Sequence, residues 1–391
     1  MPIALLALTL STFAICTAEW GIAGLLPSLS NDLQISIPTA GLLVSFYALG
    51  VAVGGPILAI VTARFPNRLV LLAFMCLFVV GNGLCALAPN YTLLVIARVV
   101  VACGHGLFFG IATIVATRLL PERQGFAVSM LFTGFTLAQL LGVPIGTAIG
   151  NAFGWRATFW SVGAAGALAT VALAALLPPT EPQAGGRTSA ADEIRALNNQ
   201  QVYLTYLAVA LLITGSLSLS TYLVPLMTDI THIPLGQTPW YLLTIGAGGL
   251  VGNLVGGRLA DWKLMPTLVA IFFGQGVLQL GLVLTSGAPL LLGMNFFVMS
   301  VVGTSFGAHV TKRILHGARA APNLASTLSN TAFNIGIAAG AWIGGTALSA
   351  GLTYDQLPWL PFVFDSAAGG VVVISWLLDR REAAAPVAEP T

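Results

Sequence analysis

The chain contains 391 residues, of which 57% are hydrophobic and 7% are charged, and its net charge is +2. Soluble domains carry roughly 25% charged residues. A chain this poor in charge cannot cover its surface with side chains that favour water. The composition therefore excludes a soluble globular protein and indicates an integral membrane protein.

Twelve apolar segments are each long enough to cross a bilayer, which requires about 20 mostly apolar residues. The first segment differs from a signal peptide because it lacks a basic leading region and carries Glu19 in its interior. The first six segments are residues 3–27, 39–61, 68–88, 91–117, 124–150 and 157–178. The second six are residues 201–228, 237–260, 265–285, 288–312, 322–348 and 358–379.

One long polar stretch, residues 179–200, separates the two sets of segments. It is rich in Pro, Gly, Ala and charged residues, a composition typical of a flexible linker. The sequence therefore predicts an all-α membrane protein of twelve helices. We expect a six-helix half at 1–178, a cytoplasmic linker at 179–200, and a second six-helix half at 201–391 that ends in a short cytoplasmic tail.

The basic residues are unevenly distributed between the two sides of these segments. With both termini in the cytoplasm, 13 of the 15 lysines and arginines fall on or near the inner side, Arg156 falls outside and Arg98 lies within a helix. Cytoplasmic loops of membrane proteins carry the excess of Lys and Arg. We therefore expect a multi-pass protein of the bacterial inner membrane with both termini in the cytoplasm.

The two predicted halves share an internal repeat. The second helix contains glycines at positions 50 and 54, and the eighth contains glycines at positions 248 and 252. In each half the first of these glycines lies thirteen residues before the start of a basic turn. Glycines four residues apart let helices approach closely, and two similar halves are what a rocking transporter requires.

The basic turns carry a family resemblance. Residues 257–261 read Gly-Arg-Leu-Ala-Asp, which resembles the loop motif of the major facilitator superfamily. The first copy has Ala63 where the family has Asp, so the resemblance implies that Asp261 is the main latch between the cytoplasmic ends of the halves. The implied gating residues are Gly257, Asp261 and Lys263 in the second loop and Arg64 and Arg68 in the first.

Two further motifs support the resemblance, which covers essentially the whole chain. In the fourth helix, Arg98 is followed by glycines at positions 104 and 106. The fifth helix holds a Gly/Pro-rich run that is similar to the signature of twelve-helix drug/proton antiporters and sugar-efflux permeases, and that run comprises Gly142, Pro144, Gly146 and Gly150. The resemblance implies the major facilitator fold and a proton-coupled exporter.

Charged side chains are costly inside a bilayer, so those within spans are candidates for function. Glu19 lies eight residues from the predicted outer end of its helix, and Arg98 and Asp365 each lie seven residues from theirs. At the α-helical rise these positions are about 10–12 Å deep. The resemblance places the last helix at the periphery. For Asp365 we therefore expect a hydrogen-bonded residue or a carboxylate that reaches the interface.

Glu19 and Arg98 are predicted to be the proton-coupling pair. By resemblance, their helices line one central cavity. A carboxyl group holds its proton less tightly beside a guanidinium and more tightly when water leaves its surroundings, so helix movement could exchange a proton for cargo. The alternative is a static structural ion pair.

Polar and aromatic residues on the cavity helices are candidate substrate contacts, although each is also of a kind that holds membrane helices together. His105 lies seven residues after Arg98, on a similar helix face, and is either a neutral structural residue or a proton relay. The candidates are Trp20, Tyr47, His105, Phe108, Gln139, Asn253, Asn330 and Asn334.

We expect no metal and no cofactor. The four cysteines lie in apolar runs without the short spacings of metal sites and are predicted to be packing residues. The sequence shows no phosphate-binding loop, so the expected driving force is an ion gradient. The expected partners are a small-molecule substrate, protons and the lipid bilayer, with no nucleic acid, and the protein is expected to be a monomer.

The motifs and the charged residues bear on three possible functions. Proton-coupled export of drugs, sugars or metabolites is favoured by the motif in the fifth helix and by Glu19. A proton-coupled or facilitative importer of a small nutrient is the alternative. A membrane enzyme would require clustered His, Asp or Glu near one membrane face, a pattern this sequence does not show, so we expect no enzymatic activity.

Overall fold

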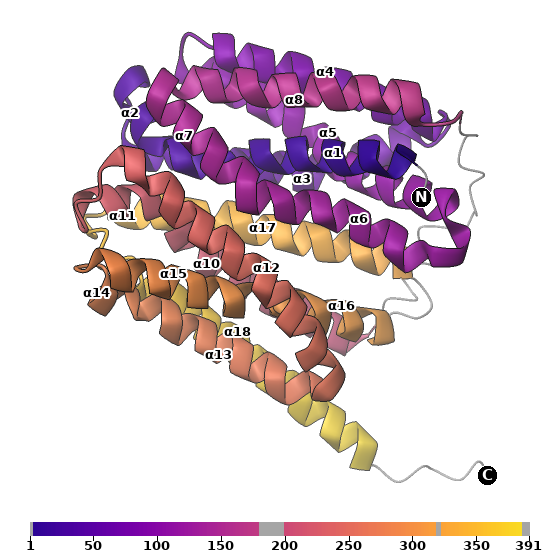
Figure 1. Cartoon of the computed structure of the whole chain (residues 1–391). Coiled ribbons are helices and arrows are strands. Elements are labelled where there is room, and N and C mark those ends of the chain that lie inside the picture. Colours follow the sequence, from indigo (N-terminus) through magenta and orange to yellow (C-terminus); the bar gives the residue numbers. More distant parts are fainter. Residues whose placement is uncertain (1–2, 180–198, 318–321, 385–391) are drawn as a thin grey trace, which may run out of the picture.

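The computed structural model describes residues 3–179, 199–317 and 322–384. Twelve helical segments among them are long and apolar enough to cross a membrane, which confirms the predicted number. The predicted linker, 179–200, lies almost wholly outside the described residues. Figure 1 shows the first six spans, in indigo to magenta, packed as one group beside the second six, in red to yellow.

The first half contains six spans, of which the first and fifth are interrupted. Span one comprises α1 (Ile3–Trp20), a 3-10 turn (Gly21–Leu25) and α2 (Leu26–Leu33). Spans two to four are α3 (Ile37–Thr62), α4 (Asn67–Leu87) and α5 (Tyr91–Leu119). Span five comprises a 3-10 turn (Pro121–Arg123), α6 (Gln124–Leu137), a π turn (Ala138–Gly142) and α7 (Val143–Phe153), and span six is α8 (Trp155–Leu176).

The second half also contains six spans, of which the seventh, ninth and tenth are interrupted. Span seven comprises α10 (Gln200–Ser220) and α11 (Leu223–Asp229), and span eight comprises a 3-10 turn (Leu235–Gln237) and α12 (Thr238–Trp262). Span nine is α13 (Leu264–Leu280) with α14 (Leu282–Thr285), and span ten is α15 (Pro289–Thr304) with α16 (Phe306–Gly317). Spans eleven and twelve are α17 (Pro322–Ser349) and α18 (Trp359–Ala384).

Polar side chains cap the N-termini of several of these helices. The first backbone N–H groups of a helix have no partner within the helix, and in lipid an unpaired backbone group is costly. Ser36 accepts a hydrogen bond from the N–H of Thr39 at the start of α3, and Asn90 accepts one from the N–H of Leu93 at the start of α5. Both caps precede an apolar run, which is why the predicted starts of these two spans are close to the observed ones.

The repeated glycines pack equivalent helices together in the two halves. Gly50 and Gly54 of α3 lie against α5, where a Cβ on Gly50 would be 2.8 Å from the Cβ of Ala102. Gly248 and Gly252 of α12 lie against backbone of α15 in the same way. The internal repeat in the sequence therefore corresponds to a structural repeat, in which the second span of each half packs closely on the fourth.

The halves meet most closely at one end, which we call the outer end. There α2 packs against α11, α11 contacts the 3-10 turn after α1, and α7 contacts α12. Asn151 of α7 donates a hydrogen bond of 2.7 Å to the carbonyl of Leu235 in the other half. Along the molecule α3 runs beside α17, while α12, α13 and α18 lean away from the first half toward the opposite, inner end (Figure 1).

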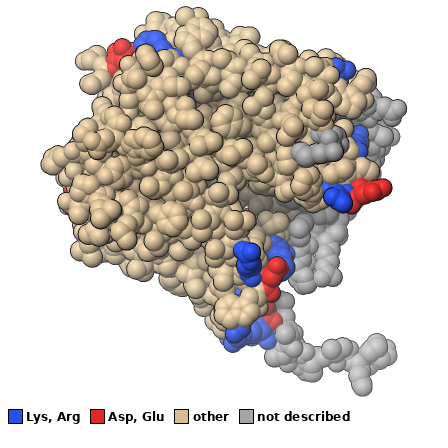
Figure 2. All heavy atoms as spheres, in the orientation of Figure 1, with Lys and Arg blue, Asp and Glu red and all other residues tan. Residues whose placement is uncertain are grey.

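The charged residues lie mainly at the two ends of the molecule. Figure 2 shows a band without charged residues between them, and a recess between the halves close to the charged residues of the inner end. The outer end carries an ion pair between Arg156 and Asp32, and the inner end carries pairs of Lys312 with Asp261 and of Arg313 with Asp379. This distribution agrees with the arrangement expected from the basic residues of the sequence.

Tyr222 closes the outer end between the halves. Its side chain is buried, and its hydroxyl donates a hydrogen bond of 2.8 Å to the carbonyl of Ala341. The ring lies in a notch formed by Gly41 of the first half and by Gly344 and Gly345 of the second, where any Cβ would contact it. Glycine is therefore needed at these three positions for the two halves to meet.

Replacing Gly41 with Ala is expected to open the outer end. The new methyl group would collide with the Tyr222 hydroxyl, and overpacking of this kind costs about 1–3 kcal/mol, which shifts an equilibrium roughly 5- to 150-fold. Spin labels at positions 31 and 229, in a background without native cysteines, would measure the separation of the halves by electron paramagnetic resonance. Gly110→Ala is the control, because no atom lies within 4 Å of a Cβ at that position. Equal distances in both variants would contradict the prediction.

Candidate functional site

One stripe of α1 is left uncovered by its neighbours. Most of α1 is buried against α5, α6 and α8. Residues 3, 6, 10, 13 and 20 keep part of their surface exposed, and their spacing of three, four or seven residues defines one face of a helix. Glu19 lies beside this stripe and is also partly exposed.

Glu19 lies deeper in the membrane than the sequence indicated. The predicted first helix ended at residue 27, but the helical segment continues through α2 to Leu33. Glu19 is therefore fourteen residues, or roughly 21 Å, from the outer end of its span. His105 is also fourteen residues from the start of α5, whereas Arg98 is seven. The longer first span thus brings Glu19 level with His105 rather than with Arg98.

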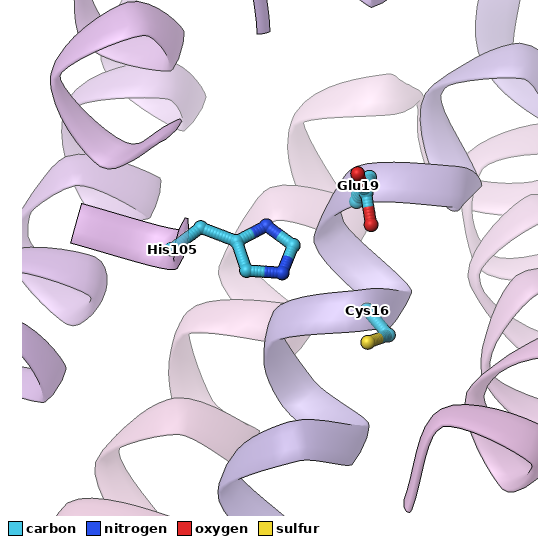
Figure 3. Close-up of side chains that lie close together, drawn as sticks. All are labelled: Cys16, Glu19 and His105. Atoms are coloured by element: carbon cyan, nitrogen blue, oxygen red, sulfur yellow. The ribbon is translucent and has the colours of Figure 1, made fainter. Parts of the chain in front are cut away.

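Three side chains meet at this depth. Cys16 and Glu19, one turn apart on α1, point toward His105 of α5 (Figure 3). The Cys16 sulfur, a Glu19 carboxylate oxygen and a His105 ring nitrogen all lie within 4.8 Å of one another. Cys16 and His105 are buried. The hydroxyl of Tyr47 lies 3.3 Å from His105 Nδ1 and holds the ring from the α3 side.

Arg98 does not form an ion pair with Glu19 in this structure. Its side chain is 2% exposed, and Nη1 donates a hydrogen bond of 3.3 Å to the carbonyl of Ala18, the residue before Glu19. The guanidinium carbon lies 4.7 Å from the centre of the Tyr47 ring. Within the described part of the chain, Arg98 Nε and Nη2 have no hydrogen-bond partner. A buried cation with two unused donors next to the Glu19 backbone is poised to bind an anionic group.

The aromatic candidates occupy different environments. Trp20 is partly exposed and packs edge-on against Phe135 of α6, with 6.4 Å between ring centres. Phe108 is fully buried in the core of the first half, where its ring centre lies 5.7 Å from that of Phe74. The partly exposed neighbour is Phe109, 5.3 Å from the His105 ring. Of these two neighbouring residues, the candidate Phe108 is buried, and Phe109 is the one that contacts the His105 ring and keeps part of its surface exposed.

The remaining polar candidates do not gather around Glu19. Gln139 lies in the π turn of span five, where its carbonyl is close to Gly246 of α12. Asn253 on α12 is exposed. Asn334 is buried and donates to the carbonyl and side-chain oxygens of Asn330 at 3.0 and 3.2 Å. The pair on α17 thus shares one helix face, as its spacing predicts.

The Gly/Pro-rich run of span five holds α1 close to the site. A Cβ on Gly142 would collide with Thr17, and one on Gly150 would collide with Leu25. Gly146 has more room, since its nearest neighbour is Thr158 at 3.2 Å. The π turn ends at Gly142 and Pro144 follows it. A π turn accommodates a proline within a helix, and such turns are frequent at functional sites.

The inner loops differ in their interactions. Asp261 pairs with Lys312 at 2.6 Å, and Lys312 also donates to the carbonyl of Ala260, so this carboxylate joins α12 to α16 within the second half. In the first loop, Arg68 donates to the carbonyl of Ala174 and Arg64 lies over the Phe65 ring. Lys263 similarly lies over the Trp262 ring, and Gly257 has open space around it.

Asp365 is a buried, hydrogen-bonded residue of the second half. It is 0% exposed, and its Oδ2 accepts a hydrogen bond of 2.9 Å from Gln279 of α13. Gly215 and Gly276 leave the space that its side chain occupies. The hydrogen-bonded alternative of the sequence analysis therefore describes this residue, and the alternative of a carboxylate reaching the interface is wrong because the neighbouring helices enclose it.

Replacing Gly142 with Ala is expected to destabilise the protein and displace α1. The methyl group would collide with Thr17, two residues from Glu19, at a cost of about 1–3 kcal/mol. Gly146→Ala in the same motif needs a shift of only a few tenths of an ångström and should be mild. Thermal unfolding of both variants in detergent measures the difference. An equal effect of the two substitutions would show that close packing on α1 is not what the motif provides.

The sequence and the structure resemble those of known transporters. The Major Facilitator Superfamily profile matches residues 8–341. The inner membrane transport protein YdhP of Escherichia coli K12 is 36% identical, over 97% of this chain and 96% of its own length. A chloramphenicol resistance protein of Streptomyces lividans is 32% identical, over 89% of this chain and 90% of its own length.

A solved structure shows the same fold. A bacterial homologue of the human lysosomal transporter Spinster, in an inward-facing and occupied conformation, matches with a TM-score of 0.81 at 17% sequence identity. The match covers 95% of this chain and 96% of the other. The arrangement of twelve spans is therefore shared even where the sequences differ.

Proposed function

The chain belongs to the Major Facilitator Superfamily and is a multi-pass membrane transporter, and we propose that it exports small molecules from the cytoplasm in exchange for protons. The cargo belongs to the range of drugs, sugars or metabolites. Both termini and the linker at 179–200 lie in the cytoplasm, and the two halves rock about the site between them.

The observation that carries this proposal is the position of Glu19. It is a carboxyl group deep within the first span, beside a partly exposed stripe of α1. Ionisable residues in such positions are expensive and mark ion or substrate pathways. Two residues of α5 lie near Glu19. His105 supplies a ring that can bind a proton, and Arg98, a permanent cation, contacts the backbone of the preceding residue.

Proton exchange follows from the two environments available to this carboxyl group. In the present arrangement Glu19 is close to His105, and the free donors of Arg98 are unused. When Glu19 loses its proton, its charge is best stabilised by those donors, since a charge-assisted hydrogen bond is roughly twice as strong as a neutral one. If α1 moves Glu19 from His105 toward the donors of Arg98, proton release is linked to rocking of the first half against the second.

Export is favoured over import by two observations. The Gly/Pro-rich run, which resembles the family's antiporter signature, packs at Gly142 against Thr17, two residues before the proposed proton site. One relative is named for resistance to chloramphenicol, which exporters confer by removing a compound from the cell. An importer would use the same fold but would move cargo and protons in the same direction.

Replacing Glu19 with Gln is expected to abolish uphill export and substrate-induced proton release while leaving downhill exchange partly intact. Gln resembles the protonated carboxyl group, so the halves can rock but cannot couple. Inverted membrane vesicles with a pH-sensitive dye and a compound panel that includes chloramphenicol would measure both fluxes. Cargo uptake into these vesicles together with proton release supports antiport, and co-movement of both would favour the importer.

A structural role for Glu19 predicts a different result. If the carboxyl group only stabilises the fold, Glu19→Gln should lower the amount of folded protein without changing coupling per folded molecule. The double variant Glu19→Gln with Arg98→Gln separates the two cases. Recovery of both stability and coupling in the double variant would contradict the proposed proton site.

Asp261 is proposed to act at the inner gate. Its pair with Lys312 is exposed, and exposed ion pairs contribute little to stability because water and salt screen them. We therefore expect Asp261→Asn to reduce transport with little change in thermal stability, because the carboxylate is needed when the inner ends meet. Substitutions at Ala63 should have less effect. Unchanged transport in Asp261→Asn together with a gain in Ala63→Asp would assign the latch to the first loop instead.

A further inference from the structure

The three side chains that meet between α1 and α5 have the chemistry of metal ligands. Cys16 offers a sulfur, Glu19 a carboxylate oxygen and His105 a ring nitrogen, and these atoms lie within 4.8 Å of one another (Figure 3). Sulfur, imidazole and carboxylate ligands are those used by Zn²⁺ and related cations. The site was not predicted from the sequence because its third ligand, His105, comes from a helix far from Cys16 and Glu19 along the chain.

The geometry requires little adjustment for a metal ion. Zinc binds sulfur at about 2.3 Å, nitrogen at about 2.0–2.1 Å and carboxylate oxygen at about 2.0–2.2 Å. In a tetrahedral arrangement the ligand atoms are then roughly 3.3–3.8 Å apart. The present limit of 4.8 Å exceeds this by about 1 Å, so metal binding would draw the three side chains closer together.

The surroundings fit a metal ligand set as well. Ligating histidines almost always make a hydrogen bond through their second ring nitrogen, and Tyr47 lies 3.3 Å from His105 Nδ1, which leaves Nε2 for the metal. A Cys16 thiolate and a Glu19 carboxylate together offset the two charges of the ion. Arg98, the nearest cation, is held on the Tyr47 ring and on the carbonyl of Ala18.

We propose that Cys16, Glu19 and His105 form a binding site for a divalent transition-metal cation of the Zn²⁺ class. Three protein ligands leave a fourth position open, as in sites that exchange their contents rather than in closed structural sites. The partial exposure of Glu19 leaves the site incompletely covered.

Metal binding would occupy the carboxyl group that the proposed function assigns to protons. Zn²⁺ would therefore inhibit export, and this consequence rests on the proposed function. Metal binding itself does not rest on the proposed function, because it depends only on the three ligands. The two can be measured separately.

Titration of the purified full-length protein, without a polyhistidine tag, with Co²⁺ tests the site directly. We expect the thiolate-to-cobalt charge-transfer band in the near ultraviolet, saturating at one ion per chain and removed by Zn²⁺. Cys16→Ser should abolish the band, and His105→Gln should weaken Co²⁺ binding while keeping the thiol. Tyr47→Phe should lower the affinity roughly 10- to 100-fold, as loss of a ligand's hydrogen-bond partner does.

Two controls distinguish this site from other cysteines and from misfolding. A variant with Cys76, Cys85 and Cys103 all changed to Ser should keep the band, and circular dichroism with size-exclusion chromatography should show that each variant is folded. Absence of the band in the wild type, or its survival in folded Cys16→Ser, overturns the proposal. A wild-type band combined with export that Zn²⁺ does not inhibit would support the metal site and contradict the role of Glu19 in export.

Discussion

The absence of water within the membrane is the constraint on which this structure depends. In lipid every backbone N–H and C=O must be paired within the protein, so the chain forms helices wherever it crosses. No hydrophobic force draws those helices together, and packing must come from close contact of small residues. The glycines of α3 and α12, which lie against α5 and α15, supply this contact in both halves and thereby set the positions of the α5 side chains that face α1.

The same constraint governs the charged residues. A side chain that can ionise inside the membrane needs a partner at its own depth, because it cannot reach water. Asp365 has Gln279 in the second half, Arg98 has the carbonyl of Ala18 and the Tyr47 ring, and Glu19 has the neighbourhood of His105. Of these three groups, Glu19 keeps partial exposure while the other two are buried. Glu19 can therefore exchange what it binds, whereas Asp365 and Arg98 are held in place by their neighbours.

The sequence predicted the fold well because long apolar runs leave little ambiguity about a membrane helix. It predicted the site less well because depth depends on where a helix ends. The first span continues to Leu33, six residues beyond the predicted end, and this shift moved Glu19 from the level of Arg98 to that of His105. The contact of Phe109 with the His105 ring was likewise absent from the sequence prediction, because the neighbouring Phe108 is equally apolar. Cys16 was recognised only as a packing residue, although its position one turn before Glu19 already placed both on one face.

Several features of the first half involve α1 and the turn that follows it. The α-helical part of span one ends at Trp20 and a 3-10 turn follows, so the backbone changes geometry directly after Glu19. Arg98 binds the carbonyl of Ala18 just before it, and Gly142 packs on Thr17 from the other side. A 3-10 turn has poorer hydrogen bonds than an α-helix and often marks a hinge. Glu19 therefore lies between two fixed contacts, at Thr17 and Ala18, and a 3-10 turn beyond which the span packs against α11 at the closed outer end.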